Sequence, residues 1–250
     1  MTDQEPGDSA ATPPVTGLDP AESTAALLAS RVLYRDALML VIDKPAGLAV
    51  HASGRGGLHL GLYLDALRFG LPVMPELAHR LDRETSGCLL LGRHRQALKR
   101  LGALFAQGRV EKTYWAAVVG APPGEAGIID QPLAKLDAKR GWRMRVDPNG
   151  QAAITEWRVL GNSGPVSWLE CRPRTGRTHQ IRVHLAAIGC PILGDPIYGQ
   201  GTATMLADCL HLHARAVLVP LYPKKPPVAV EAPLPPHMTA ALAACGWVVR

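Results

Sequence analysis

The chain has 250 residues, of which 47% are apolar and only 5% aromatic, so it can form one catalytic domain with a largely aliphatic core. Its formal net charge is +6, but residues 1–30 hold five acids and no Lys or Arg, which leaves a net charge of +11 on the rest. The cysteine pattern argues against a disulfide framework and no apolar run approaches the roughly 18 residues of a membrane span, which favours a cytoplasmic protein with no membrane partner.

The N-terminal half begins with a segment that is poor in large apolar residues. Residues 1–30 are acidic and rich in Pro, Ser, Thr and Ala, so we expect a disordered acidic tail, followed by a single domain over residues 31–250. Residues 31–43 indicate a strand pair or a strand that enters a turn. Apolar residues at helical spacing predict a helix near residues 60–67 and a second near 98–105, which Gly108 ends.

The C-terminal half has mostly strand character. Alternating or β-rich segments predict strands at 110–119, 153–160, 166–172 and 210–219. Residues 178–188 return to helical spacing, with Thr178 as the expected N-terminal cap, and a short helix should follow Pro235-Pro236. Strands and helices that do not alternate regularly favour an α+β fold over a doubly wound sheet.

The segment His79–Gly87 (HRLDRETSG) is a charged loop that leads directly into the apolar residues of a buried strand. Such a loop can hold a carboxylate rigidly at the rim of a cleft, and two arginines flank Asp82 and favour its charged form. The other interpretation of this segment is a loop with ordinary surface ion pairs.

The segment Arg172–His184 places four arginines and two histidines in thirteen residues, across a loop and the start of a helix. The amides at the start of a helix favour an anion, and arginine side chains are suited to phosphate or carboxylate. A solvated basic face is the alternative. A third segment, Glu111–Ala116, puts Tyr114 on one face of a strand, either as a surface for a nucleic-acid base or as a core residue.

Metal-ligating patterns are weak in this sequence. Cys209, His211 and His213 alternate along an expected strand, but no second ligand pair has the usual spacing. We therefore predict no metal site.

These segments, in their order along the chain, resemble the RluA-type RNA pseudouridine synthases. HRLDRETSG at 79–87 is similar to the signature of that family, and RTHQIRVH at 177–184 is similar to its arginine motif. The segment 43–51 resembles the family's KPxG opening, and 112–114 resembles its tyrosine strand. The segments 194–199 and 212–214 follow in the same order, so the resemblance spans roughly residues 31–240. It implies the pseudouridine synthase fold, which is α+β with a mixed, mostly antiparallel sheet, flanking helices and a central catalytic cleft. It also implies an isomerase that acts on uridine in RNA.

The resemblance also implies roles for single residues. Asp82 matches the essential aspartate, Tyr114 the tyrosine that packs on the target uracil, and Arg182 the arginine that pairs with the aspartate. Ile181 matches an apolar residue of the base pocket, and Arg80 matches a residue that fills the gap left by a flipped nucleotide. The remaining residues that we expect to bind substrate are Arg83, Arg177, Thr178, His179 and Gln180.

Some features depart from the family pattern or stay open. Ala52 stands where the family often has Pro, and the chain has no room for the S4-type RNA-binding domain of several relatives. We expect a structured RNA partner, ribosomal or transfer RNA, and a monomer.

Pseudouridine formation needs base flipping and a carboxylate but neither a redox step nor a hydrolytic water, so no cofactor is expected. Direct attack by Asp82 and deprotonation to a glycal-like intermediate both fit these residues. The rival functions are a non-catalytic RNA-binding protein on the same fold and an enzyme for small phosphorylated sugars or nucleotides.

Overall fold

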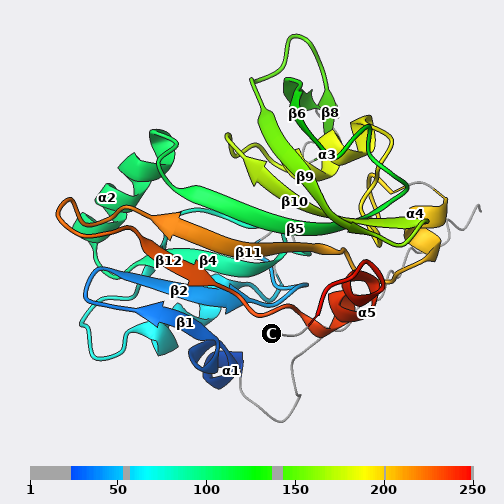
Figure 1. Cartoon of the computed structure of the whole chain (residues 1–250). Coiled ribbons are helices and arrows are strands. Elements are labelled where there is room, and N and C mark those ends of the chain that lie inside the picture. The colour runs from blue at the N-terminus through cyan, green and yellow to red at the C-terminus, as the bar shows by residue number, and fades with distance from the viewer. Residues whose placement is uncertain (1–23, 53–56, 137–142, 200, 249–250) are drawn as a thin grey trace, which may run out of the picture.

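The computed structural model describes residues 24–52, 57–136, 143–199 and 201–248 and has the α+β architecture that the sequence predicts (Figure 1). Within those ranges, ten strands form one long sheet. They are β1 (Val32–Arg35), β2 (Met39–Lys44), β3 (Glu76–Leu77), β4 (Ser86–Gly92), β5 (Glu111–Val119), β6 (Ala126–Asp130), β9 (Ile154–Asn162), β10 (Val166–Pro173), β11 (Leu212–Val219) and β12 (Val228–Glu231). A separate antiparallel pair consists of β7 (Leu133–Lys135) and β8 (Met144–Val146).

The strand order is β1-β2-β4-β11-β5-β10-β9-β6, with β12 paired to β11 and β3 paired to β4. Each pairing recorded for the described strands of this sheet is antiparallel except that of β4 with β11, which is parallel. The mixed, mostly antiparallel sheet is therefore confirmed. The predicted strands at 110–119, 153–160, 166–172 and 210–219 correspond to β5, β9, β10 and β11.

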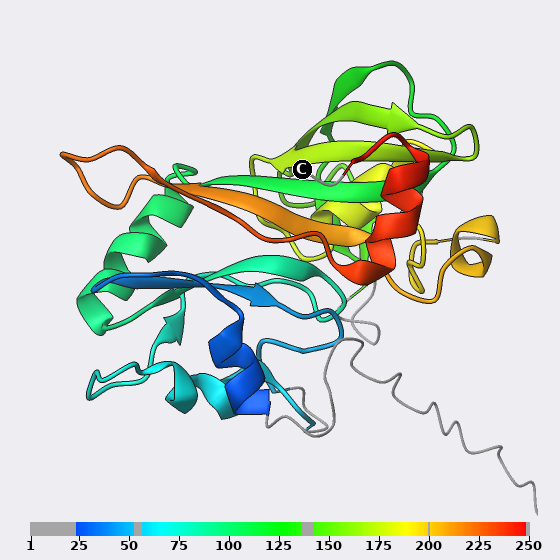
Figure 2. The same ribbon diagram turned by 60° about the horizontal axis from the view of Figure 1, so that its bottom comes forward.

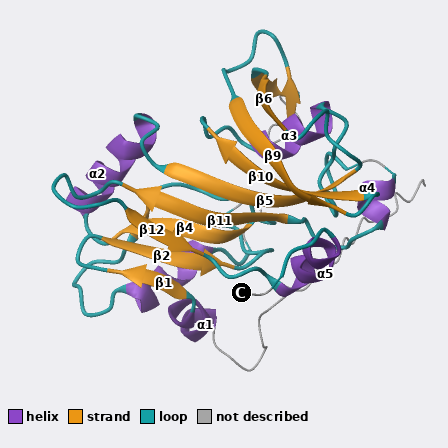
Figure 3. Cartoon of the chain, in the orientation of Figure 1, coloured by secondary structure: helices purple, strands orange, loops and turns teal. Residues whose placement is uncertain are grey.

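The helices lie around the sheet, at its ends and along its margins (Figure 3). They are α1 (Thr24–Ser30), the 3-10 helix η1 (Leu60–Leu67), α2 (Arg95–Ala106), α3 (Gln180–Ala187), α4 (Thr202–Met205) and α5 (Pro236–Ala244). Figure 2 shows α2 near one end of the long strands and α5 near the other. The side chain of His94 caps α2 by accepting from the Ala97 amide, and Gly108 ends the segment with a φ of 66°.

The strands β1, β2 and β4 join the rest of the sheet through a short parallel pairing of β4 with β11. In this pairing Ser86 lies opposite His213 and Gly87 opposite Ala214. Gly87 has a φ of 105°, and a Cβ atom there would lie 2.3 Å from the carbonyl oxygen of Ala214. Only glycine fits this position, because it tolerates both the left-handed backbone and the close approach. The junction fixes the strand that directly follows the loop of Asp82.

Two local predictions were wrong, and a third was right only in part. Residues 24–30 form α1, which the sequence placed in the tail, because Leu27 and Leu28 are buried there; the rest of the predicted tail, residues 1–23, lies outside the described residues. The helix predicted near residues 60–67 is present, but as a 3-10 helix. Helix α3 begins at Gln180 rather than at Thr178, and His179 stands at its N-cap with a left-handed backbone.

The main core lies between the sheet and the packed helices, and it contains buried side chains from β2, β4, β5 and α3, among them Leu40, Leu89, Ala116 and Leu185. Tyr114 and Ile181 belong to the same cluster and reach the edge of the core. In the described ranges, none of the helices has both the length and the apolar character needed to cross a membrane.

Candidate active site

A cleft of about 630 Å³ is lined by the loop before β4, the C-terminal end of α2, the start of β5 and the segment from the end of β10 into α3. This volume lies within the range of small-ligand sites. Nine of the ten predicted site residues line the cleft. They are Arg80, Asp82, Tyr114, Arg177, Thr178, His179, Gln180, Ile181 and Arg182.

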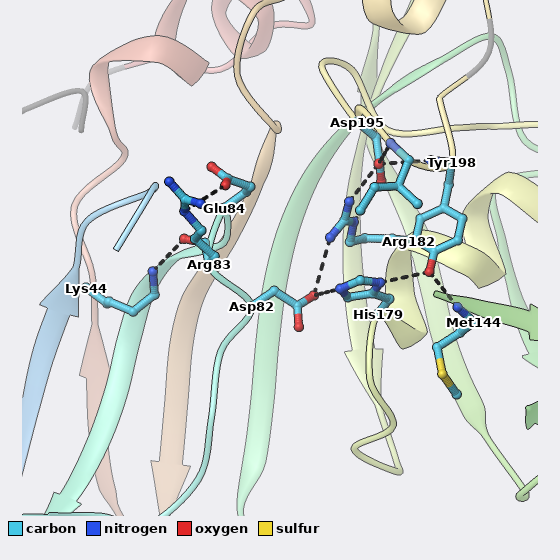
Figure 4. A network of polar contacts seen from close by, with 10 residues as sticks. Lys44, Asp82, Arg83, Glu84, Met144, His179, Arg182, Asp195 and Tyr198 are labelled. Atoms are coloured by element: carbon cyan, nitrogen blue, oxygen red, sulfur yellow. Dashed lines mark hydrogen bonds and ion pairs between the residues drawn. The ribbon is translucent and has the colours of Figure 1, made fainter. Parts of the chain in front are cut away.

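Asp82 comes from the loop between β3 and β4, and its side chain is 17% exposed. The nitrogen atoms that approach it come from the opposite wall, at the start of α3 (Figure 4). Its Oδ2 atom lies 3.8 Å from Nη1 of Arg182 and 4.0 Å from Nε2 of His179. The fold thus brings residues 97 and 100 positions apart in the sequence to a single carboxylate oxygen.

Lys44 anchors the loop of Asp82 through hydrogen bonds to backbone carbonyl groups. The Nζ atom is fully buried and donates to the carbonyl oxygens of Pro45 (2.7 Å), Leu48 (2.9 Å) and Arg83 (3.0 Å). Burial lowers the pKa of Lys44 to about 7, against the opposing attraction of Glu84 and Asp82. The lysine therefore ties the KPAG segment to the residue that follows Asp82, a role that its sequence motif did not reveal.

Arg182 has its strongest contacts with Asp195, not with Asp82. Nε and Nη2 donate to the two oxygens of Asp195 at 2.8 and 2.7 Å, and the two side chains are only 2% and 0% exposed. Asp195 also accepts from the amides of Ile197 and Tyr198. Burial alone would raise the pKa of Asp195, but the hydrogen bonds from Arg182 and from these amides hold that pKa below its usual value. The predicted Asp82–Arg182 pair exists as a longer contact, and sequence reasoning assigned Asp195 no role.

His179 lies between Asp82 and Tyr198 (Figure 4). Its Nδ1 atom is 2.8 Å from the hydroxyl of Tyr198, which also accepts from the amide of Met144 at 2.9 Å. Burial lowers the pKa of His179, as do the positive charges of Arg182 and Arg80, against the opposing pull of Asp82 and Asp195. The ring is therefore neutral at pH 7. The sequence analysis gave Tyr198 no role in the site, because it lies in the family-like segment 194–199 but has no chemical pattern around it that indicates a function.

Tyr114 and Ile181 form the apolar floor near Asp82. They are 9% and 6% exposed and line the cleft from β5 and α3. Burial raises the pKa of the Tyr114 hydroxyl, with a further contribution from the charge of Asp82, so the hydroxyl keeps its proton at pH 7. A ring and an aliphatic side chain beside a carboxylate suit a flat heterocycle.

Two predicted substrate-binding residues have other tasks. Arg83 lies outside the cleft lining, because its Nε donates to the carbonyl of Gly47 and pairs with Glu84 at 3.4 Å. Gln180 is buried; its Oε1 accepts from Thr175 Oγ1 and from the amide of Arg177, and its Nε2 donates to Ile154 and Thr155. The N-cap of α3 is His179, which makes no side-chain capping hydrogen bond, and Thr178 lines the cleft.

Cations gather along the rim of the cleft. Lys112, Arg172 and Arg174 line it together with Arg80 and Arg177. Arg172 pairs with Glu170 at 3.0 Å and Arg174 with Glu156 at 2.8 Å, but both arginine side chains remain more than half exposed. Lys112 crosses toward the other wall and donates to the carbonyl of Thr175. The rim can therefore contact several phosphates, whereas the floor beside Asp82 is apolar.

Comparisons with known proteins point to a single family. The family model described as RNA pseudouridylate synthase matches residues 38–187. The chain is 46% identical over 215 residues to an uncharacterized RNA pseudouridine synthase of Zymomonas mobilis, covering 85% of this chain and 97% of that protein. It is 38% identical over 256 residues to the ribosomal large subunit pseudouridine synthase C of Vibrio cholerae, covering 95% and 79%. The structure of human RNA pseudouridylate synthase domain containing 4 is similar with a TM-score of 0.74 and 30% identity, covering 89% of this chain and 95% of that one.

Proposed function

Because the chain belongs to the RNA pseudouridylate synthase family and is an isomerase that converts uridine in RNA to pseudouridine, we propose that Asp82 is its catalytic carboxylate and that its substrate is ribosomal or transfer RNA. The observation that carries this proposal is the position of Asp82 at the meeting point of an apolar floor and two nitrogen donors. A non-catalytic RNA-binding protein on the same fold would have no need for a carboxylate held in this way.

The reaction breaks the bond between uracil N1 and ribose C1′, turns the base, and joins C5 to C1′. The C5–H bond then breaks and its proton is lost, while N1 gains a proton. Asp82 acts on the sugar or the base as a nucleophile, or removes a proton to give a glycal-like intermediate; both routes need a carboxylate beside the glycosidic bond. Oδ2 of Asp82 lies near Arg182 and His179, which support the negative charge from the α3 side. The uracil ring would lie against Tyr114 and Ile181.

The cationic rim supports an RNA substrate rather than a free nucleoside. A uridine inside a folded RNA must leave its stack, which costs a few kcal/mol. Contacts from Arg174, Arg177 and Lys112 to phosphates would offset that cost. Arg80 is exposed at the mouth of the cleft, next but one to Asp82, where it could fill the gap left by the extruded nucleotide.

The substitution Asp82→Asn tests the catalytic assignment. We expect no measurable tritium release from RNA labelled at uridine C5, with RNA affinity close to that of the wild type, because arginines supply the binding. The matched control is Asp208→Asn, the same change at an exposed residue outside the cleft lining, which should leave turnover intact. Turnover by Asp82→Asn near the wild-type rate would overturn the assignment.

The RNA class is tested separately. Pseudouridine mapping of total RNA from cells with and without the gene should show specific sites that disappear from ribosomal or transfer RNA. The named function of the Vibrio cholerae relative favours large-subunit ribosomal RNA as the first place to look. Loss of sites only from other RNA classes would contradict this part of the proposal. A monomer is expected as well, and sedimentation of the purified protein checks it.

A further inference from the structure

His179 has a backbone conformation that most residues avoid. It stands directly before α3 with φ 53° and ψ 19°, the left-handed region, in which His, Asn and Asp are more frequent than other side-chain-bearing residues. This conformation turns the imidazole to the space between Asp82 and Tyr198, and the side chain is only 10% exposed. A strained residue in a candidate site invites a functional explanation.

The contacts of Tyr198 favour one position for the proton on the ring of His179. The tyrosine oxygen already accepts from the amide of Met144, so its own proton is free to be donated to Nδ1 of His179. Nδ1 then accepts, and the proton of the neutral ring stays on Nε2. Nε2 is the atom that lies 4.0 Å from Oδ2 of Asp82. The opposite tautomer would turn a lone pair toward the carboxylate, which is repulsive.

Among the described residues, both nitrogens that approach the carboxylate of Asp82 approach Oδ2, and no recorded hydrogen bond or ion pair reaches Oδ1. The distances of 3.8 and 4.0 Å exceed a hydrogen bond, as is common before a substrate closes a site. A carboxylate held by one oxygen presents the other to a reacting atom in a defined direction.

We propose that His179 is a positioning residue for Asp82: Tyr198 holds its imidazole as the Nε2–H tautomer, and this donor acts with Arg182 on Oδ2 so that Oδ1 is left to react. The proposal rests on the proposed function of Asp82. It differs from the sequence-based expectation that His179 binds the substrate itself, because substrate binding would appear in KM and positioning in kcat.

Two substitutions of His179 separate this role from a structural one. The amide nitrogen of Gln can reach the position of Nε2, whereas that of Asn reaches only the position of Nδ1. Asn is the better residue for the left-handed backbone, so a purely structural role predicts that His179→Asn is the more active variant. Positioning predicts the reverse: kcat of His179→Gln within about 5-fold of the wild type, and kcat of His179→Asn lower by about 30-fold or more. KM for RNA should stay within about 3-fold in both.

Tyr198→Phe provides an independent check. Without the hydroxyl both tautomers become populated, so kcat should fall by about 3- to 10-fold in the wild-type background. In the His179→Gln background the same change should cost almost nothing, since glutamine does not need Tyr198 to set its donor. Equal losses in the two backgrounds would contradict the proposal.

A direct readout does not depend on any variant being active. In protein labelled with 15N at its nine histidines, the signal of His179 should show an unprotonated Nδ1 and a protonated Nε2 at pH 7, with His179→Asn used for assignment. The opposite tautomer or an imidazolium would overturn the proposal. Asp82→Asn in the same turnover assay separates the catalytic role of Asp82 from the positioning role of His179. An active Asp82→Asn variant overturns the proposed function. An inactive Asp82→Asn variant together with a fully active His179→Asn variant overturns only the role of His179.

Discussion

Two nitrogens of Arg182, Nε and Nη2, donate to Asp195, and the third nitrogen, Nη1, faces Asp82. The two parallel hydrogen bonds fix the plane of the guanidinium, so the direction of Nη1 follows from Asp195 and not from Asp82. Because Asp195 is completely buried, the pair also compensates a charge that could not otherwise lie in the core. The geometry at Asp82 therefore depends on a carboxylate that lies outside the cleft lining.

Asp195→Asn should lower both stability and turnover. Removing one partner of a buried ion pair leaves the other charge without compensation and should reduce the free energy of unfolding by about 3 kcal/mol. Because Nη1 loses its direction, turnover at saturating RNA should fall as well. Denaturant unfolding and tritium release measure the two effects. The control is Asp65→Asn, which breaks an exposed pair with Arg68 and should cost less than about 1 kcal/mol; equal losses in both variants would contradict the argument.

Acid should destabilise the protein in part through His79. This residue accepts a hydrogen bond from the Leu90 amide through Nε2, and burial lowers the pKa of His79 to about 3. Between pH 6.5 and about 3 the unfolded chain therefore binds a proton that the folded chain does not. Stability that is fully present above pH 6.5 should fall by about 1.4 kcal/mol per pH unit for this one group.

The matched variant is His79→Gln, whose side-chain oxygen can accept from the same amide but does not take up the proton. Urea unfolding at several pH values from 7 to 4 should show a shallower loss of stability in the variant than in the wild type. Identical slopes would mean that His79 is protonated in the folded state.

RNA binding should depend strongly on salt. If the rim engages about four to six phosphates, log affinity should fall with log salt at a slope of roughly −3 to −5. Arg174→Ala removes an exposed rim cation and should reduce the slope by about one unit, with little effect on turnover at saturating RNA. Lys224→Ala, at an exposed position outside the cleft lining, should keep the wild-type slope. A slope near zero in the wild type would argue against phosphate contacts.

Two truncations test where the folded domain begins. Removing residues 1–23 should change neither melting nor turnover, because that segment has an acidic, proline-rich composition and precedes α1. Removing residues 1–30 also takes away Leu27 and Leu28, which are 9% and 0% exposed, and should reduce the free energy of unfolding by about 3 kcal/mol or more. Equal stability of the two truncated proteins would show that α1 contributes nothing to the core.

The sequence by itself determined the features that depend on neighbouring residues. The alternation of residues 110–119 predicted β5 with Tyr114 on one of its faces, and the side chain of Tyr114 lines the cleft. Gly108 ended α2 as expected, since a left-handed residue there needs no long-range contact. The ordered motifs also identified the family and nine residues of the cleft, because these segments keep their order and spacing along the chain.

Only the tertiary structure decided which buried polar groups meet. Arg182 has its main partner in Asp195, and Lys44 ties two segments together through the carbonyl of Arg83, 39 residues away. Sequence patterns report which side chains share a face of one element, but a buried charge takes whichever partner the fold brings within about 3 Å. For the same reason Arg83, adjacent to Asp82 in sequence, turns out of the cleft, while His179, 97 residues from Asp82, points at it.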